Sequence, residues 1–300
     1  WMTIKTAVLN LPLGGGKGGI KLDPKQLSFD DKEKITRKFV QLLANNIGPD
    51  IDIPAPDMYT NASIMAVATD EILKIKGHNA LGTFTGKPVS LGGIPGRSEA
   101  TALGGIIVLE QYLKDHSQSL NGKKVIIQGM GNAGINAAEI LSQKGAIVIG
   151  VADSKGGLYK PEGLELDSLI SCKIAGNSVQ SCEVNKGEAM QVSSQEILEK
   201  EADILVLAAR ENVITEDNAE KIQAKLLLEL ANGPITPEAD VILDQAKATI
   251  LPDVLANAGG VTVSYFEYVQ NKNNDVNTVE TVHQRLKEFM IEAYRAVKNQ

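Results

Sequence analysis

The stretch from Gly122 to Asp153 constrains the fold of this chain more than any other part of its sequence. A short apolar run, KKVIIQG, leads into the glycine turn GMGNAG, and apolar residues at helical spacing follow as far as Lys144. A second apolar run, AIVIGVAD, ends at Asp153. Strand, glycine turn, helix and strand within about 30 residues form a βαβ unit. The sequence therefore predicts parallel strands joined by a helix.

Further short apolar runs continue this pattern: ADILVLAA, KLLLELA and ATILP. Strands that alternate with connecting segments predict an α/β fold with a parallel sheet covered on both faces. Ahead of the βαβ unit the sequence predicts helices. One begins after Ser28, with Asp31 completing an approximate capping box, and a second begins after Asn61 and ends at Gly77. A third is expected over Glu99–Lys114.

The glycine turn fits a dinucleotide-binding fingerprint. Gly129, Gly131 and Gly134 satisfy G-x-G-x-x-G, and Asp153 follows at the end of the second strand. In this pattern the first glycine permits a tight turn, the second lets the backbone approach a pyrophosphate, and the third lets helix pack on strand. The helix that starts near Asn132 offers unpaired N–H groups to the anion. The alternative is a glycine-rich turn that binds nothing.

The expected cofactor is NAD or NADP, with NAD slightly favoured. Asp153 can accept hydrogen bonds from the adenosine ribose hydroxyls and would repel a 2′-phosphate. Lys155 lies two residues further on and would soften that preference.

Composition limits the class of partner. The 300 residues carry a net charge of −7, and an acidic chain lacks the surface that neutralises nucleic-acid phosphates. No apolar run approaches the ~18 residues that a membrane span needs. The two cysteines, Cys172 and Cys182, have no metal-ligand spacing, so we expect no metal site and reduced thiols in a cytoplasmic protein. Because the first residue is Trp1, we expect the chain to begin downstream of a native start.

A second glycine loop, PLGGGKGGI, surrounds Lys17. It does not match a phosphate-binding P-loop, because the required glycine and hydroxyl positions hold Leu11 and Gly18. Glycines around a lysine let a substrate approach closely and leave the ammonium poorly hydrated, which lowers a lysine pKa toward neutrality. Lys5, on an expected strand Lys5–Leu11, is a candidate for holding a carboxylate, and Asp57 is a candidate proton carrier. Each of these residues taken alone also fits an ordinary solvated charge.

Taken together, these segments resemble a known family. They are KTAVLNLPLGGGKGGI, DIPAPDMYTN, TGKPVSLGGIPGRSEAT, ANGPITPEAD and ILPDVLANAGGVTVSYFEYVQN. In this order they look like the glutamate branch of the glutamate, leucine, phenylalanine and valine dehydrogenases. The resemblance covers nearly the whole chain and implies two domains. These are an α/β substrate domain over residues 1–105, joined by a returning helical segment over 256–300, and a Rossmann-like dinucleotide-binding domain over 106–255.

The resemblance also implies a reaction, the reversible NAD(P)-dependent deamination of L-glutamate to 2-oxoglutarate and ammonia. It implies that Lys17 activates water as a catalytic lysine and that Asp57 shuttles protons. It further implies that Lys5 binds the substrate α-carboxylate and that Ser264 contacts the side-chain carboxylate. Positions near the nicotinamide end are expected at Thr101, Asn232 and Asn257. A homo-oligomer, a hexamer in this family, is the expected assembly.

The chain also departs from the family pattern. The upstream KGGIR-type segment and the later C-terminal helices are missing, so we expect a chain truncated at both ends. Leu103, Leu207, Arg210 and Leu230 replace family residues in or near the cofactor half. Two alternative functions therefore stay open. One is a non-catalytic nucleotide-binding paralogue or regulatory subunit. The other is a dehydrogenase of apolar amino acids such as leucine or valine.

Overall fold

A computed structural model describes residues 1–183 and 187–299 of the chain. Contacts between residues divide the chain into two units. Unit 1 comprises residues 1–98 and 260–286, and unit 2 comprises residues 99–259 and those from 287 onward. The predicted assignment of a substrate domain and a dinucleotide-binding domain to parts of the chain stays a prediction.

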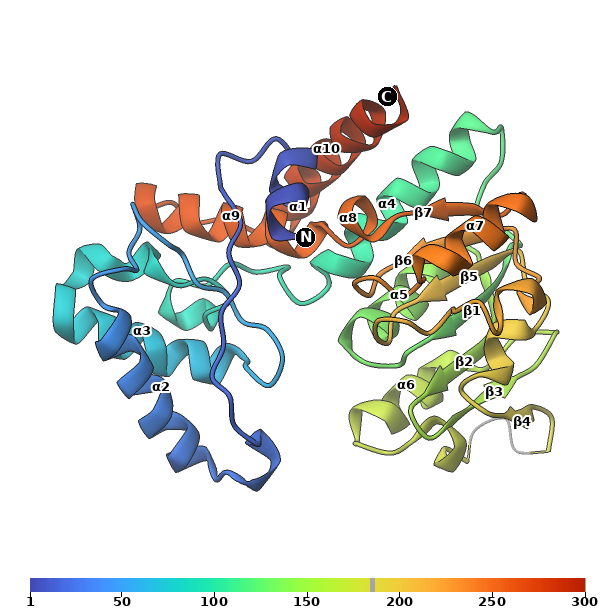
Figure 1. Ribbon diagram of the computed structural model, residues 1–300, viewed down its shortest axis with the longest axis horizontal. Coiled ribbons are helices and arrows are strands. Elements are labelled where there is room, and N and C mark those ends of the chain that lie inside the picture. Colours follow the sequence, from blue (N-terminus) through green and yellow to red (C-terminus); the bar gives the residue numbers. More distant parts are fainter. Residues whose placement is uncertain (184–186, 300) are drawn as a thin grey trace. The chain divides into compact units, whose positions relative to one another are not determined.

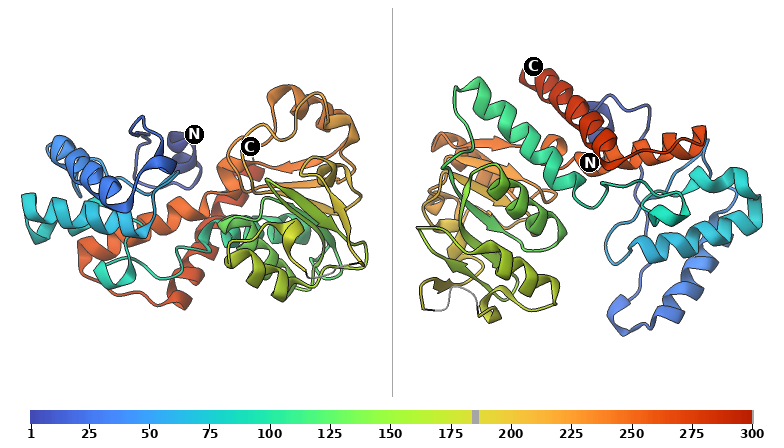
Figure 2. Two further views of the ribbon diagram at one scale, coloured as in Figure 1. Left: turned by 90° about the horizontal axis from the view of Figure 1, so that it is seen from below. Right: turned by 180° about the vertical axis from the view of Figure 1, so that it is seen from behind.

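Two helices of unit 1, α2 (Phe29–Leu43) and α3 (Ala62–Lys76), run side by side (Figure 1 and Figure 2). The predicted caps are confirmed: the Ser28 hydroxyl accepts a hydrogen bond from the N–H of Asp31 at 3.1 Å, and the Asn61 side chain caps α3. Gly77 ends α3 with a φ of 79°, a conformation that favours glycine. The core between these helices contains Val40, Met65, Ile72 and Phe84 among its members.

The predicted strand over Lys5–Leu11 is wrong, because this segment begins in a helix, α1 (Met2–Val8). Thr6 is β-branched and would favour a strand. Its hydroxyl, however, donates hydrogen bonds to the carbonyls of Met2 at 3.1 Å and Thr3 at 3.0 Å, which suits the helical conformation. Unit 1 also contains most of α9 (Gly259–Asn273) and the first part of α10 (Val279–Lys298).

Unit 2 is built on one sheet, which within the described residues has seven strands in the order β4-β3-β2-β1-β5-β6-β7 (Figure 1). The strands are β1 (Lys124–Gln128), β2 (Ile147–Asp153), β3 (Gly156–Tyr159), β4 (Met190–Val192), β5 (Ile204–Leu207), β6 (Leu226–Glu229) and β7 (Thr249–Leu251). The five strands expected from the sequence are present and pair in parallel. The sheet is not wholly parallel as predicted, because β3 and β4 extend one edge antiparallel.

Helices cover both faces of this sheet, as predicted (Figure 1 and Figure 2). On one face α5 (Asn132–Gln143) packs on β1 and β2, and α4 (Ala100–Asp115) packs on β6. On the other face, buried apolar residues of five strands form a core with residues of α7 (Pro237–Gln245). Two further helices belong to this unit, α6 (Leu166–Ile174) and α8 (Asp253–Ala256). The expected βαβ unit is thus β1, α5 and β2.

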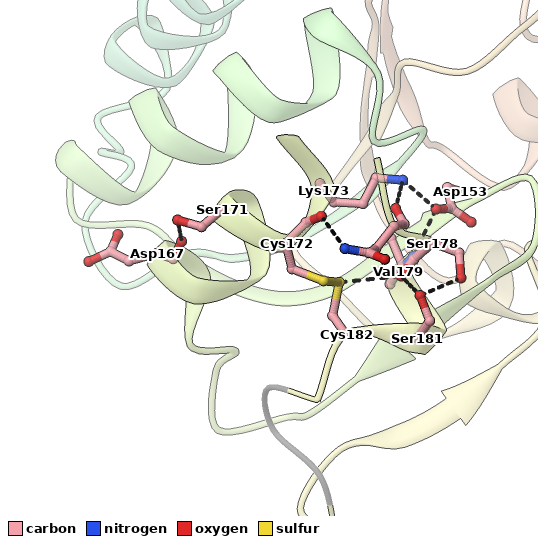
Figure 3. The surroundings of a disulfide bond; sticks show 10 residues. Asp153, Asp167, Ser171, Cys172, Lys173, Ser178, Val179, Ser181 and Cys182 are labelled. Atoms are coloured by element: carbon pink, nitrogen blue, oxygen red, sulfur yellow. Dashed lines mark hydrogen bonds and ion pairs between the residues drawn. A yellow bond between two sulfur atoms is a disulfide. The ribbon is translucent and has the colours of Figure 1, made fainter. Parts of the chain in front are cut away.

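The prediction of two reduced thiols is wrong, because Cys172 and Cys182 form a disulfide (Figure 3). Cys172 lies in α6, and the chain turns at Gly176, where φ is 90°. This reversal brings the two Cα atoms to 5.9 Å, although ten positions separate the residues in sequence. The expectation of a cytoplasmic protein was based partly on reduced thiols, and the disulfide does not support that part of it. None of the helices in the described part of the chain combines the length and apolar character that crossing a bilayer requires.

Candidate functional site

In unit 1 the structure brings together the two residues predicted to do chemistry. The ammonium of Lys17 forms an ion pair with the carboxylate of Asp57. At Gly15 the backbone of the glycine loop packs closely against α1, because an added Cβ would lie 2.1 Å from the backbone nitrogen of Thr3. Around Gly14 and Gly16 an added Cβ would meet nothing within 4 Å. The loop is therefore anchored at one glycine and open beside the lysine.

The surroundings of Lys17 differ from the expectation of a poorly hydrated ammonium. Its side chain is 65% exposed, and that of Asp57 is 49% exposed. What the glycines provide in this structure is access for a ligand rather than burial. The charge of the lysine is balanced by a carboxylate that lies forty positions away in sequence.

Asp57 is held as an ionised carboxylate. Its own backbone accepts a hydrogen bond from Thr60, and its side chain accepts one from the N–H of Met58 at 2.8 Å. Partial burial would raise the pKa of Asp57. The hydrogen bond and charge of Lys17, the N–H of Met58 and the charge of Lys5 outweigh burial and lower that pKa. Lys5, on α1, is 7% exposed. The three predicted groups therefore act on one another.

Ser264, on α9, is also buried, and its hydroxyl accepts a hydrogen bond from Nε of Arg97 at 3.0 Å. Sequence reasoning did not single out Arg97. Burial lowers the pKa of this arginine, and the charge of Glu267 opposes that shift. The only sequence signal was a second cation in the loop TGKPVSLGGIPGR, and its partner on α9 lies far away along the chain.

The loop that carries Arg97 is fixed to α9 by a buried ion pair between Lys87 and Glu267. Both side chains are fully buried, and Nζ of Lys87 lies 2.8 Å from Oε1 of Glu267. Glu267 also accepts hydrogen bonds from the N–H groups of Gly86 at 2.9 Å and Lys87 at 3.2 Å. Three donors on one carboxylate satisfy its buried charge. Glu267 therefore positions the segment that leads to Arg97.

In unit 2 the three fingerprint glycines divide into two kinds. An added Cβ on Gly134 would lie 1.7 Å from the carbonyl oxygen of Gly129, and one on Gly129 would lie 2.5 Å from the backbone of Ala208. These two glycines allow α5 and β5 to approach the turn. Gly131 meets nothing within 4 Å and is the N-cap of α5, whose first amides receive no side-chain cap. Open space at these amides suits an anionic phosphate group.

The turn lies at the carboxyl ends of β1, β2 and β5. The N–H of Gly129 donates to the carbonyl of Ala152 at 2.8 Å, and the N–H of Ala208 donates to that of Gln128 at 2.7 Å. The chain leaves β1 toward β2 on one side and returns as β5 on the other, which makes this a topological switch point. Ligands of open α/β sheets bind at such points. Asp153 ends β2 at the same edge, as predicted, and Asn132 begins α5.

Two more predicted residues meet at this edge of the sheet. Nδ2 of Asn257 donates to Oδ1 of Asn232 at 2.9 Å and to the carbonyl of Ala231 at 3.1 Å. Oδ1 of Asn257 is buried and has no hydrogen-bond partner among the described residues, and the same holds for Oε1 of Gln128. Buried acceptors without donors are rare in folded proteins and suit a polar ligand. Thr101 lies in the first turn of α4.

The glycines, the uncapped helix start, Asp153 and the two unpaired acceptors fit a dinucleotide. Among the described residues, no group of three or more histidine, cysteine, aspartate or glutamate side chains is placed to hold a metal ion.

Family models match both ends of the chain. The model described as Glutamate/Leucine/Phenylalanine/Valine dehydrogenase matches residues 92–300. The model described as Glu/Leu/Phe/Val dehydrogenase, dimerisation domain, matches residues 1–74. The chain belongs to the glutamate/leucine/phenylalanine/valine dehydrogenase family.

Relatives within this dehydrogenase family are similar along nearly the whole chain. An NAD-specific glutamate dehydrogenase of Staphylococcus aureus (strain COL) is 45% identical over 99% of this chain and 70% of its own length. A cryptic catabolic NAD-specific glutamate dehydrogenase of Bacillus subtilis (strain 168) is 43% identical over 99% of this chain and 68% of its own length. The chain thus spans about 70% of the length of these relatives.

Solved structures of the family share the fold. The hetero-hexameric glutamate dehydrogenase of Thermus thermophilus in its leucine-bound form has a TM-score of 0.92 and 37% identity, over 100% of this chain and 70% of that chain. The glutamate dehydrogenase of Peptoniphilus asaccharolyticus has a TM-score of 0.84 and 38% identity, over 100% of this chain and 71% of that chain.

The residues that depart from the family pattern are accommodated in the structure. Leu207 is fully buried at the end of β5, and its carbonyl accepts hydrogen bonds from the N–H groups of Leu230 and Ala231. Leu230 is buried beside Gly105, where an added Cβ would lie 2.4 Å from the leucine side chain. The missing Cβ of that glycine leaves space for the larger residue. Leu103 is half-buried, and Arg210 is exposed.

Proposed function

We propose that this chain catalyses the reversible NAD(P)-dependent oxidative deamination of L-glutamate to 2-oxoglutarate and ammonia. The observation that carries the proposal is the ion pair between Lys17 and Asp57 in an open glycine loop, beside the buried Lys5. A cation and a carboxylate in contact form a proton-exchanging pair, and a further lysine supplies charge for an anionic substrate. The NAD-specific relatives at 45% and 43% identity support the same reaction.

Each polar residue of the candidate site in unit 1 is proposed to have one role. Lys5 binds the α-carboxylate of glutamate. Asp57 is ionised because its pKa is lowered, so it accepts a proton from the substrate amino group and returns one in the reverse direction. Lys17 holds and activates the water that replaces the amino nitrogen at the α-carbon. Ser264 contacts the side-chain carboxylate, and its neighbour Arg97 supplies positive charge there.

The coenzyme is proposed to bind in unit 2. The N-terminus of α5, beginning at Asn132 and opened by Gly131, holds the pyrophosphate, and Asp153 holds the adenosine ribose. Gly129 and Gly134 keep the turn in place for this contact. The nicotinamide end is proposed to lie near three polar residues: Thr101, Asn232 and Asn257. When bound, the nicotinamide supplies the acceptor for the hydride that leaves the α-carbon.

The choice of glutamate over an apolar amino acid rests on the pair formed by Arg97 and Ser264. A leucine or valine side chain placed against a partly buried guanidinium and a buried hydroxyl would leave both polar groups without a ligand partner. A second carboxylate would satisfy them. Reduction of NAD⁺ and NADP⁺ should therefore occur with glutamate, and leucine and valine should support it much less. Equal turnover of leucine and glutamate would contradict this assignment.

Two variants test the proposed chemistry. Lys17→Ala should lower kcat by about a hundredfold or more, because it removes a group that acts on protons in the reaction. Lys21→Ala changes an exposed lysine of the same loop and should leave turnover unchanged. Because Lys17 is exposed, neither variant should change the thermal unfolding of the chain. Full turnover by Lys17→Ala would refute the mechanism.

We also infer that the chain forms a homo-oligomer, a hexamer, through the region that matches the dimerisation-domain model. Large apolar side chains of this region are more than half exposed: Phe29 at 52%, Leu42 at 70% and Met58 at 77%. Exposed apolar surface of this kind marks protein–protein contacts. Light scattering after size-exclusion chromatography should give a mass about six times that of one chain. Leu42→Lys should lower that mass if this region forms the interface.

A further inference from the structure

The carboxylate of Asp153 is already engaged by the protein itself (Figure 3). Oδ1 accepts a hydrogen bond from the N–H of Lys155 at 2.9 Å. Oδ2 accepts one from Nζ of Lys173 at 2.6 Å and one from the N–H of Val179 at 2.8 Å. A carboxylate has about four acceptor sites. Three of those sites are used here, which leaves Asp153 room for one ribose hydroxyl rather than two.

Lys173 also changes the charge of this position. It lies in the last turn of α6, its side chain is 13% exposed, and that of Asp153 is 12% exposed. Burial would raise the pKa of Asp153, but the hydrogen bond and charge of Lys173 and two backbone N–H groups lower it, so the carboxylate stays ionised. An ionised aspartate and an ammonium together have no net charge. The repulsion that excludes a 2′-phosphate from an isolated aspartate is therefore offset.

The lysine is held in this place by the turn that follows α6. Nζ of Lys173 donates a second hydrogen bond, to the carbonyl of Asn177 at 2.8 Å. The disulfide between Cys172 and Cys182 closes the same turn, with Cys172 next to Lys173 and Cys182 three positions after Val179. An ammonium has three donors. The contacts with Asp153 and Asn177 use two, and the third is available to an anionic ligand.

We propose that Lys173 is a specificity-determining residue of the coenzyme site, which lets the site accept a dinucleotide with a 2′-phosphate as well as one without. The inference rests on the proposed coenzyme site at Asp153. In this arrangement the third donor of Lys173 contacts the 2′-phosphate, while the remaining acceptor of Asp153 binds the ribose of the unphosphorylated dinucleotide.

Binding of two half-ligands, ADP-ribose and its 2′-phosphate, tests the proposal without any turnover. Isothermal titration calorimetry should show that the unaltered protein binds the two with Kd values within about tenfold of each other. Lys173→Met should weaken binding of the 2′-phosphate by about tenfold or more, the effect of one lost charge-assisted hydrogen bond. Lys173→Arg keeps the charge and should retain binding. Lys144→Met, which removes a lysine paired with Glu110 elsewhere in unit 2, should change neither Kd.

A second pair of variants covers the case in which Lys173→Met fails to fold because it leaves Asp153 unpaired. Asp153→Asn removes the buried charge, and Asp153→Asn combined with Lys173→Met removes both. The double variant should bind the 2′-phosphate about tenfold more weakly than Asp153→Asn alone. Equal affinities in that comparison, or an unchanged ratio in Lys173→Met, would overturn the role of Lys173 while leaving the coenzyme site intact. Failure of both half-ligands to bind the unaltered protein would overturn the coenzyme site itself.

Discussion

Replacing Gly134 by alanine should destabilise unit 2, whereas the same change at Gly131 should mainly weaken coenzyme binding. A Cβ at position 134 would lie 1.7 Å from the carbonyl oxygen of Gly129, where ordinary contacts begin at 3.4 Å. Relief requires α5 or the turn to move by more than an ångström. Gly129 itself has little room to move, because a Cβ added to it would lie only 2.5 Å from the backbone of Ala208.

Overpacking of this kind typically costs about 1 to 3 kcal/mol, and we expect the upper end here because the two nearest atoms both belong to the backbone of Gly129. For a unit of this size, a loss of about 3 kcal/mol lowers the melting temperature by roughly 6 to 12 °C. Thermal unfolding followed by circular dichroism would measure it. Gly131→Ala should lose less than about 1 kcal/mol, since alanine is only a poorer N-cap than glycine and its Cβ has open space.

Coenzyme affinity should rank the two variants differently. At 25 °C, where both are folded, Gly131→Ala should raise the Kd for NADH by about tenfold or more, because its methyl group occupies the space in which the pyrophosphate approaches the amides of α5. Two results would refute the reasoning. One is a melting temperature for Gly134→Ala that matches that of Gly131→Ala. The other is wild-type NADH affinity in Gly131→Ala.

Three further changes test other parts of the structure. Burial raises the pKa of Glu229 from 4.5 to about 7. This group therefore contributes stability below about pH 4.5 that is lost as the pH rises through 7. In denaturant unfolding curves, Glu229→Gln should remove up to roughly 3 kcal/mol of this dependence of the unfolding free energy on pH. Glu267→Gln leaves Lys87 buried without a counter-charge and should cost about 3 to 5 kcal/mol, whereas Asp50→Asn, in an exposed pair, should cost less than about 1 kcal/mol in the same unfolding assay. Reduction of the disulfide by a dithiol should lower the stability of unit 2 by roughly 2 to 3 kcal/mol, and a variant with both cysteines changed to serine should show no response to the dithiol.

The elements that the sequence predicted correctly are those specified by neighbouring residues. Ser28 and Asn61 predict where α2 and α3 begin, because an N-cap residue forms its hydrogen bond within three positions of itself. The segment Lys5–Leu11 was wrongly predicted as a strand, because the hydrogen bonds of the Thr6 hydroxyl that suit a helix exist only once the helix has formed. The strand β3 escaped prediction because it is short, starts at a glycine and exists through its pairing with β2.

The residues of the candidate site also divide into those predicted from neighbouring sequence and those that depend on distant contacts. The positions of the glycines, Asp57 and Asp153 were predicted from local motifs and from resemblance. The contacts of Arg97 with Ser264 and of Lys87 with Glu267 were not predicted, because they form only after α9 folds against a loop distant in sequence. No periodicity or spacing in one sequence encodes such contacts. The prediction of a poorly hydrated Lys17 is wrong for a related reason. Glycines around a lysine indicate that a ligand can reach the side chain, but they do not determine whether the side chain is buried.

Asp153 shows how far a sequence motif can predict coenzyme preference. A motif rule assigns an acidic residue at the end of the second strand to the ribose hydroxyls and derives a preference for NAD from its charge. That derivation assumes a carboxylate whose acceptors and charge are available to the ligand. Here Lys173, twenty positions further on, takes up both an acceptor and the charge. Coenzyme preference in this chain therefore depends on the pair, and the residue that decides it lies outside the fingerprint.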